Sequence, residues 1–146
     1  MLQVDEAQAC LAQAQKYWQS QQWQETIQTC AQALALDQQL PQAHKLMGDA
    51  LQKTGKAKEA IGYYQEAIKL NPDFIEVYAN LGTLYVQQKQ YSLGINYYQQ
   101  ALKIDPNFTG VKKHLARAKL LLQSHSVSMV PADANTALDH HLEQGR

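Results

Sequence analysis

Residues 75–108, with the sequence IEVYANLGTLYVQQKQYSLGINYYQQALKIDPNF, decide the fold. Apolar residues recur in the first half of this stretch at intervals of three and four, namely Val77, Tyr78, Leu81, Leu84 and Tyr85. That spacing is typical of one face of an α-helix, and Asp73 with Glu76 predicts a capping box at its start, near Phe74. A polar turn at 88–90 leads to a second helix over about 91–104, which ends at Asp105 because the residue before a proline is disfavoured in the helical region. The stretch therefore predicts two helices joined by a short turn.

The same organisation recurs along the chain with a period of 34 residues. Three segments align without gaps, over residues 7–40, 41–74 and 75–108, and a partial fourth begins at residue 109. Gly48 matches Gly82 at this spacing, and Pro72 matches Pro106. We expect Gly82, with Gly94 opposite it, to let the two helices of a repeat approach closely. A repeated helix pair predicts an all-α protein.

The repeated residues resemble the tetratricopeptide repeat family, whose unit is a 34-residue helix–turn–helix. The third segment supplies Tyr78, Leu81, Gly82, Tyr85, Tyr98, Ala101 and Pro106, and the second supplies Met47, Gly48, Ala60, Tyr64, Ala67 and Pro72. The first segment is the most divergent, with Cys10 and Cys30 at two positions that are aromatic in the family. The resemblance implies a right-handed α-solenoid of three helix–turn–helix repeats with a C-terminal capping helix.

This reading divides the chain into two parts. Residues 1–123 form the repeat domain, with repeats at 7–40, 41–74 and 75–108 and the capping helix at 108–123. Lys112 and Lys119 lie on the face of that last helix where a further helix would pack, so we expect this face to be solvated. Residues 124–146 are polar and are expected to form a weakly ordered tail, with a possible short helix at 136–143.

Composition narrows the classes of function. The chain carries 13 basic and 13 acidic residues, and a zero net charge argues against a nucleic-acid partner. No apolar stretch is long enough for a membrane span, and the N-terminus does not resemble a secretory signal. Two cysteines are too few for a disulfide framework, which favours a reducing compartment and a cytoplasmic protein. Glutamine, a good helix former, occurs 22 times.

No motif for catalysis, cofactor binding or metal binding is present in the sequence. We therefore expect no enzyme activity, no cofactor and no metal, and we interpret the adjacent His140 and His141 as solvated tail residues. Cys10 and Cys30 should be neighbours in the first repeat. They form either a pair of small buried side chains or a redox-active pair.

In this family the first helices of the repeats line a concave surface that commonly holds an extended peptide or a helix of a partner. The resemblance places the following residues there: Leu11, Gln15, Trp18, Lys45, Asp49, Lys53, Asn80, Thr83, Lys113 and Arg117. Trp18 is the candidate anchor, since tryptophans are frequent hot spots of binding. The alternative for Trp18 is a side chain half covered by Leu2 and Val4.

The charges of this predicted surface suggest a class of ligand. The predicted surface has more basic than acidic residues: Lys45, Lys53, Lys113 and Arg117 against Asp49 and Glu76. An acidic ligand segment would therefore suit its second half. Some family members hold the acidic tails of heat-shock chaperones with a clamp of Lys, Asn, Asn, Lys and Arg. Lys45 and Asn80 match that clamp, but Asp49, Gly110 and His114 do not. We therefore expect no binding of chaperone tails.

The sequence thus predicts a non-catalytic scaffold that binds a protein or peptide partner. One alternative is a regulatory or substrate-presenting segment of a larger enzyme, such as a transferase. A second alternative is a structural protein that associates with itself. We expect a monomer, and weak self-association is the alternative.

Overall fold

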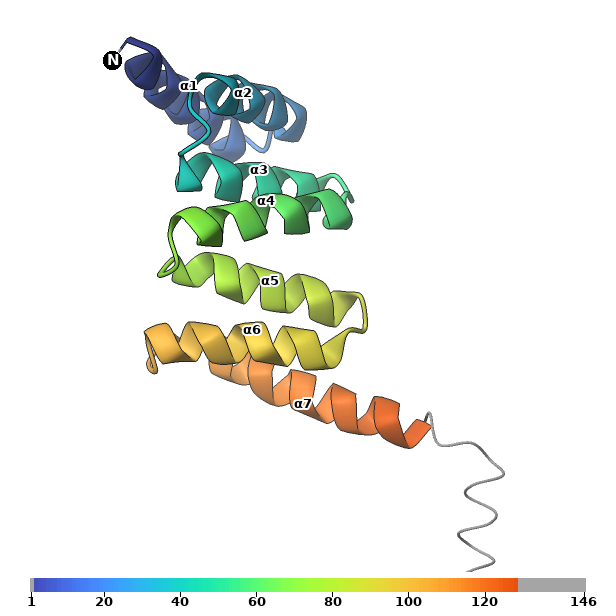
Figure 1. Cartoon of the computed structure of the whole chain (residues 1–146). Helices are drawn as coiled ribbons and strands as arrows, with labels where there is room; N and C mark the ends of the chain where they lie inside the picture. The colour runs from blue at the N-terminus through green and yellow to red at the C-terminus, as the bar shows by residue number, and fades with distance from the viewer. Residues whose placement is uncertain (1, 129–146) are drawn as a thin grey trace, which may run out of the picture.

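The computed structural model describes residues 2–128, and every regular element within that range is an α-helix. The helices are α1 (Leu2–Gln19), α2 (Trp23–Leu36), α3 (Pro41–Lys53), α4 (Ala57–Leu70), α5 (Ile75–Gln87), α6 (Tyr91–Ile104) and α7 (Val111–Ser128). Three hairpins, α1–α2, α3–α4 and α5–α6, stack in chain order, and α7 packs on α6 (Figure 1). The all-α solenoid expected from the sequence is confirmed. The possible helix at 136–143 lies outside the described residues.

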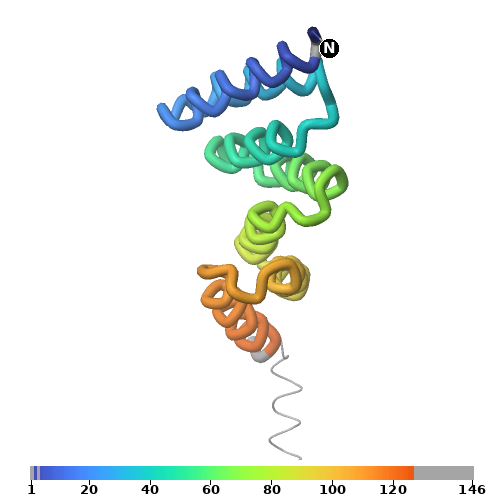
Figure 2. Tube along the Cα trace, turned by 90° about the vertical axis from the view of Figure 1, so that its left-hand side faces the viewer, coloured from blue at the N-terminus to red at the C-terminus, as the bar shows by residue number. Residues whose placement is uncertain are grey.

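Successive hairpins are turned relative to one another, so the stack is a twisted rod with α1 and α7 at opposite ends (Figure 2). The buried side chains form two clusters along this rod. One runs from α1 to α5 and includes Tyr64 and Leu81, and the other joins α5, α6 and α7 and includes Tyr78 and Tyr98. Because α5 contributes to both clusters, the core continues through the stack. None of the helices within residues 2–128 is both long and apolar enough to cross a membrane.

The turn inside each hairpin is closed in the same way in all three repeats. A residue with positive φ follows the first helix at intervals of 34 residues: Gln21 (60°), Gly55 (81°) and Lys89 (65°). The N–H of the next residue then donates to a carbonyl five residues back, in the pairs Gln22–Tyr17, Lys56–Leu51 and Gln90–Tyr85 at 2.9, 2.8 and 2.9 Å. These are the bonds of a Schellman motif, which satisfies carbonyl groups at a helix C-terminus.

The second helix of each repeat ends at an Asp or Asn with extended backbone. The side-chain oxygens of Asp37, Asn71 and Asp105 each accept a bond from the N–H two residues on, at 2.9, 3.2 and 2.9 Å. The sequence prediction assigned this role to proline. The first repeat has no proline at that position, yet α2 ends at the equivalent place. The turn made by the Asp or Asn side chain is therefore common to all three repeats.

Two local predictions need correction. The capping box of Asp73 and Glu76 does not form, because Phe74 is the N-cap residue of α5 and no side chain caps that helix. The last helix spans 111–128 rather than 108–123, since Gly110 adopts a φ of 91° immediately before it. Its orientation is as expected: Val111 and Ala118 are buried, while Lys112 and Lys119 are exposed.

Candidate binding surface

Three hollows lie along the first helices of the repeats and α7. The α1–α3 hollow has a volume of about 220 Å³ and is lined by Gln15, Trp18, Gln19, Gln42, Lys45, Leu46 and Asp49. The α3–α5 hollow has a volume of about 350 Å³ and is lined by Trp18, Lys45, Asp49, Gln52, Lys53, Glu76 and Asn80. The α5–α7 hollow has a volume of about 360 Å³ and is lined by Thr83, Val86, Gln87, Tyr98, His114, Arg117, Ala118 and Leu121. The first two hollows share three residues and are therefore adjoining.

The structure brings most of the residues assigned from the sequence to these hollows. Eight of the ten line at least one of them, the exceptions being Leu11 and Lys113. The assignment of Leu11 is wrong, because its side chain is only 6% exposed and packs in the core with its hairpin. Lys113 is exposed on α7 but lines none of the three hollows.

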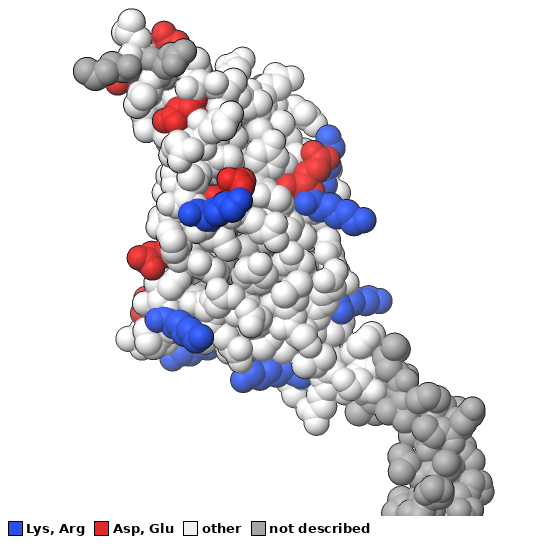
Figure 3. All heavy atoms as spheres, viewed as in Figure 1, with Lys and Arg blue, Asp and Glu red and all other residues white. Residues whose placement is uncertain are grey.

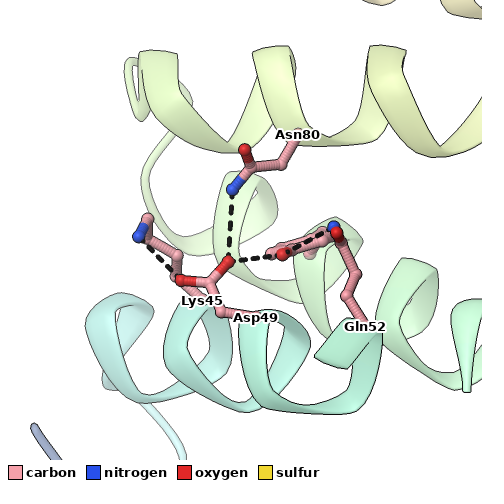
Figure 4. A network of polar contacts seen from close by, with 5 residues as sticks. Lys45, Asp49, Gln52 and Asn80 are labelled. Atoms are coloured by element: carbon pink, nitrogen blue, oxygen red, sulfur yellow. Dashed lines mark hydrogen bonds and ion pairs between the residues drawn. The ribbon is translucent and has the colours of Figure 1, made fainter. Parts of the chain in front are cut away.

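Asp49 lies at the centre of a polar network that joins three helices (Figure 4). Its Oδ2 is 2.9 Å from Nζ of Lys45, and its Oδ1 accepts bonds from the hydroxyl of Tyr64 on α4 and from Nδ2 of Asn80 on α5, the latter at 3.3 Å. Nε2 of Gln52 donates to the hydroxyl of Tyr64 at 3.0 Å. The Asp49 side chain is only 12% exposed, so these partners replace most of its water.

This network changes the electrostatic reading of the surface. Lys45 forms an ion pair with Asp49. Its positive charge is therefore already compensated and does not favour an acidic ligand. Lys53 lies with its Nζ 5.6 Å from the ring centre of Trp23, a cation–π contact. Among the lysines and arginines that line the three hollows, Lys53 in the α3–α5 hollow and Arg117 in the α5–α7 hollow therefore have no ion-pair partner within the described residues.

Trp18 stands between the α1–α3 and α3–α5 hollows and is half-buried. The ring of Trp23 covers part of it, with ring centres 4.9 Å apart and planes inclined by 57°. The alternative that Leu2 and Val4 cover Trp18 is wrong, because both lie at the far end of the same helix and are exposed. The remaining face of Trp18 is open to the two hollows.

Sequence reasoning missed the role of two tyrosines in the second helices. A Cβ atom on Gly48 would lie 2.6 Å from Cε1 of Tyr64, and one on Gly82 would lie 2.6 Å from Cδ1 of Tyr98. Each ring therefore fills the space that its glycine leaves, and its hydroxyl reaches the hollow side of the first helix. Tyr64 bonds Asp49 there, and Tyr98 bonds Oγ1 of Thr83 at 2.8 Å. The shared 34-residue spacing of the glycines and tyrosines was the available signal.

The expected opposition of Gly82 and Gly94 is also present. A Cβ atom on Gly94 would lie 2.8 Å from the carbonyl oxygen of Gly82, so α5 and α6 approach closely at this point.

Burial is the main cause that raises the pKa of both Tyr64 and Tyr98. The two hydroxyls therefore remain hydrogen-bond donors at neutral pH.

Both cysteines contribute to the core of the first repeats. Cys30 is fully buried, Cys10 is partly buried, and both are free thiols. Burial, aided by the negative charge of Asp49, raises the pKa of Cys30 to about 12. Cys30 is therefore a thiol rather than a reactive thiolate at neutral pH. Within residues 2–128 no group of three or more His, Cys, Asp or Glu side chains is placed to hold a metal, and His140 and His141 lie outside that range.

Comparison with solved structures shows the same architecture in other proteins. The first TPR domain of Spaghetti (RPAP3) bound to an HSP90 peptide superimposes with a TM-score of 0.79 at 18% identity, covering 82% of this chain and 94% of that one. MamA protein gives 0.77 at 20% identity, covering 94% and 75%. A mutant of the O-GlcNAc transferase of Thermobaculum terrenum gives 0.74 at 22% identity, covering 81% of this chain and 23% of that one.

Sequence comparison identifies the repeats themselves. A model described as TPR repeat matches residues 48–89, and a model described as tetratricopeptide repeat matches residues 75–108. No curated protein matches the sequence. The second model coincides with the 34-residue unit that decided the fold. Residues 48–108 of this chain are therefore matched by models of the tetratricopeptide repeat.

Proposed function

We propose that this protein is a non-catalytic scaffold that binds an extended peptide segment of a partner protein along the α1–α3 and α3–α5 hollows. The observation that carries the proposal is the continuity of these two hollows, which meet at Trp18, Lys45 and Asp49. Together they offer a binding surface across three helices. Such a surface suits a chain that runs over it rather than a compact small molecule.

The side chains around the hollows suit a peptide backbone. Four glutamines, Gln15, Gln19, Gln42 and Gln52, line the two hollows, and each amide can both donate and accept a hydrogen bond. Trp18 between them offers a large, partly preordered apolar surface for one ligand side chain. The partner segment should therefore be extended, with one apolar side chain at Trp18.

The Asp49 network argues against an acidic tail as the ligand. The first TPR domain of Spaghetti (RPAP3) holds an HSP90 peptide, but in this chain both clamp-like residues, Lys45 and Asn80, already bond the Asp49 carboxylate. A peptide carboxylate placed beside them would meet a second carboxylate, which is unfavourable. We propose that the segment bound across these two hollows is uncharged or weakly charged.

Peptides selected from a random display library against the wild-type protein test the proposal. Trp18→Ala should weaken a selected peptide about tenfold or more, since hot-spot truncation typically costs about 2 kcal/mol or more. Gln28→Ala on α2, which is exposed and lines none of the three hollows, should leave the affinity unchanged. Equal weakening by both variants, or none by Trp18→Ala, would contradict the proposal. The intrinsic fluorescence of the Trp18–Trp23 pair provides a label-free readout.

A second candidate function is supported by one comparison. The likeness to the transferase covers 23% of that chain, so this architecture occurs there as part of an enzyme. On this second reading the same hollows present a substrate protein to a catalytic domain. A reading frame that continues past Arg146 into a catalytic domain would favour it over a separate scaffold.

A further inference from the structure

The zero net charge of the chain conceals a strong asymmetry along it. Residues 1–40 carry four acidic residues and one basic residue, a net charge of −3. Helix α7 carries four basic residues, Lys112, Lys113, Arg117 and Lys119, and no acidic residue, a net charge of +4. Residues 41–74 and 75–108 between them carry net charges of +1 and 0. The solenoid therefore has an acidic first repeat and a basic last helix.

These opposite charges cannot neutralise each other within one molecule. Helices α1 and α7 lie at the two ends of the rod (Figures 1 and 2), and Figure 3 shows acidic side chains at the upper end, side chains of both signs in the middle and basic ones toward the lower end. The ion pairs of the described residues, Lys45–Asp49 and Lys69–Glu66, both lie in the middle of the stack. No ion pair within residues 2–128 involves the three acidic and basic side chains of α1, Asp5, Glu6 and Lys16, or the lysines and arginine of α7, Lys112, Lys113, Arg117 and Lys119.

Each end also presents an uncovered helix face. On α1 the exposed residues Leu2, Asp5, Ala9, Gln13 and Lys16 follow one another at intervals of three and four, as one face of a helix requires. We call this the α1 end face. Asp5 and its exposed neighbour Glu6 lie near the beginning of the helix, and Lys16 lies 11 residues beyond Asp5, about 16 Å along the axis.

The corresponding face of α7 consists of Lys112, Ala116, Lys119 and Gln123, all exposed and again spaced by three and four. We call this the α7 end face. Leu120 beside it is 64% exposed, and Leu2 on the α1 end face is 77% exposed. Ala9 and Ala116 stand near the middle of their faces, where small side chains allow two helices to approach closely. The beginning of the α1 end face, with Asp5 and the adjacent Glu6, is acidic, whereas Lys16 near its other end is basic. The acidic part is complementary in charge to Lys112 and Lys119 of the α7 end face, and each end adds one large apolar side chain.

We propose that the protein associates head to tail with a second copy of itself, with the α1 end face of one molecule docking on the α7 end face of the next. The contact is heterologous, so every open assembly keeps one free end of each kind and can add further copies. It uses neither the α1–α3 nor the α3–α5 hollow. Because the charges are exposed, the association is weakened by salt.

Charge reversal with mixing tests this proposal on the full chain. Asp5→Lys/Glu6→Lys makes the α1 end basic, and Lys112→Glu/Lys119→Glu makes the α7 end acidic. In sedimentation velocity at low ionic strength, about 0.03 M, the wild type should associate, and each reversed variant alone should dissociate about tenfold more readily. An equimolar mixture of the two variants should associate again, because the acidic α7 end of one meets the basic α1 end of the other.

Two further full-chain variants serve as controls. Lys56→Glu/Lys58→Glu makes the same charge change at exposed residues in the middle of the rod and should associate like the wild type. Neutralising Asp133, Asp139 and Glu143 in the C-terminal residues should also leave association unchanged. Loss of association in either control, persistence of it in the reversed variants, or failure of the mixture to associate would overturn the proposal. Thermal melts of every variant verify that it folds.

Discussion

The ring of Tyr64 occupies the space where a side chain on Gly48 would stand, with a Cβ at Gly48 only 2.6 Å from the ring. The same relationship joins Tyr98 to Gly82 in the next repeat. The equivalent residues of the first repeat, Ala14 and Cys30, are both fully buried. In the first repeat, Ala14 on the first helix is larger than the glycine of the other repeats, and Cys30 on the second helix is smaller than their tyrosine. The two positions therefore share one volume, and this volume holds the hairpin together.

Gly82→Ala should destabilise the protein although alanine favours helices more than glycine does. The added methyl group would have to displace the ring of Tyr98, and overpacking of this kind costs about 1–3 kcal/mol. Urea denaturation measures the change. Gly62→Ala on α4 is the matched control, because a Cβ there meets no atom within 4 Å. That variant should gain about 0.5–1 kcal/mol from helix propensity. Destabilisation of both variants to the same extent would contradict the shared-volume explanation.

Lys89→Gly should stabilise the protein. Lys89 has a φ of 65°, a left-handed conformation that strains residues with a Cβ, whereas Gly55 fills the equivalent position of the second repeat. Allowing for the greater freedom of glycine in the unfolded chain, the expected gain is about 0.5–1 kcal/mol. The reciprocal variant Gly55→Ala should lose stability by a similar amount. Thermal melting of the two variants tests the expected gain and the expected loss of stability. A loss of stability in Lys89→Gly would refute the strain argument.

Asp49→Ala should lower the free energy of unfolding by about 1–3 kcal/mol, because it leaves Lys45, Tyr64 and Asn80 without their shared acceptor. Asp73→Ala is the comparison, since Asp73 is exposed and its carboxylate caps no helix; its change should stay within about 0.5 kcal/mol. A double-mutant cycle with Asn80→Ala isolates the bond between α3 and α5. A coupling energy below about 0.5 kcal/mol would show that this bond contributes little.

Stability should fall at alkaline pH. Burial raises the pKa of Tyr64 above its ordinary value of about 10, so the unfolded chain loses this proton at a lower pH than the folded chain. The stabilisation is complete below pH of about 10 and declines above it, by about 1.4 kcal/mol per pH unit for each retained proton. Tyr64→Phe should show a shallower decline. Urea unfolding at stepped alkaline pH, with tyrosinate absorbance as a second signal, measures both slopes. Equal slopes in the two proteins would exclude Tyr64 as a source.

Local sequence determined the helices of this protein. The three- and four-residue apolar spacing of Val77, Leu81 and Leu84 and the 34-residue repeat specify helix pairs, because periodicity and turn chemistry depend on residues close together in the chain. The same reasoning predicts that Lys112 and Lys119 lie on an exposed face, and both are exposed in the structure. It misplaced the cap of α5, where Phe74 is buried and no side chain caps the helix.

Tertiary structure alone decided which polar groups of the binding surface are already engaged. Lys45 and Asn80 both read from the sequence as ligand-binding residues, and the bond from Asn80 to Asp49 spans 31 positions of the chain. Leu11 read as a surface residue and is core. Contacts of this kind depend on how α1, α3, α4 and α5 pack, which spacing along one helix does not specify. From the sequence, Asp49 was a negative charge on the binding surface that would repel an acidic ligand. In the packed structure it is the hydrogen-bond acceptor that links α3, α4 and α5.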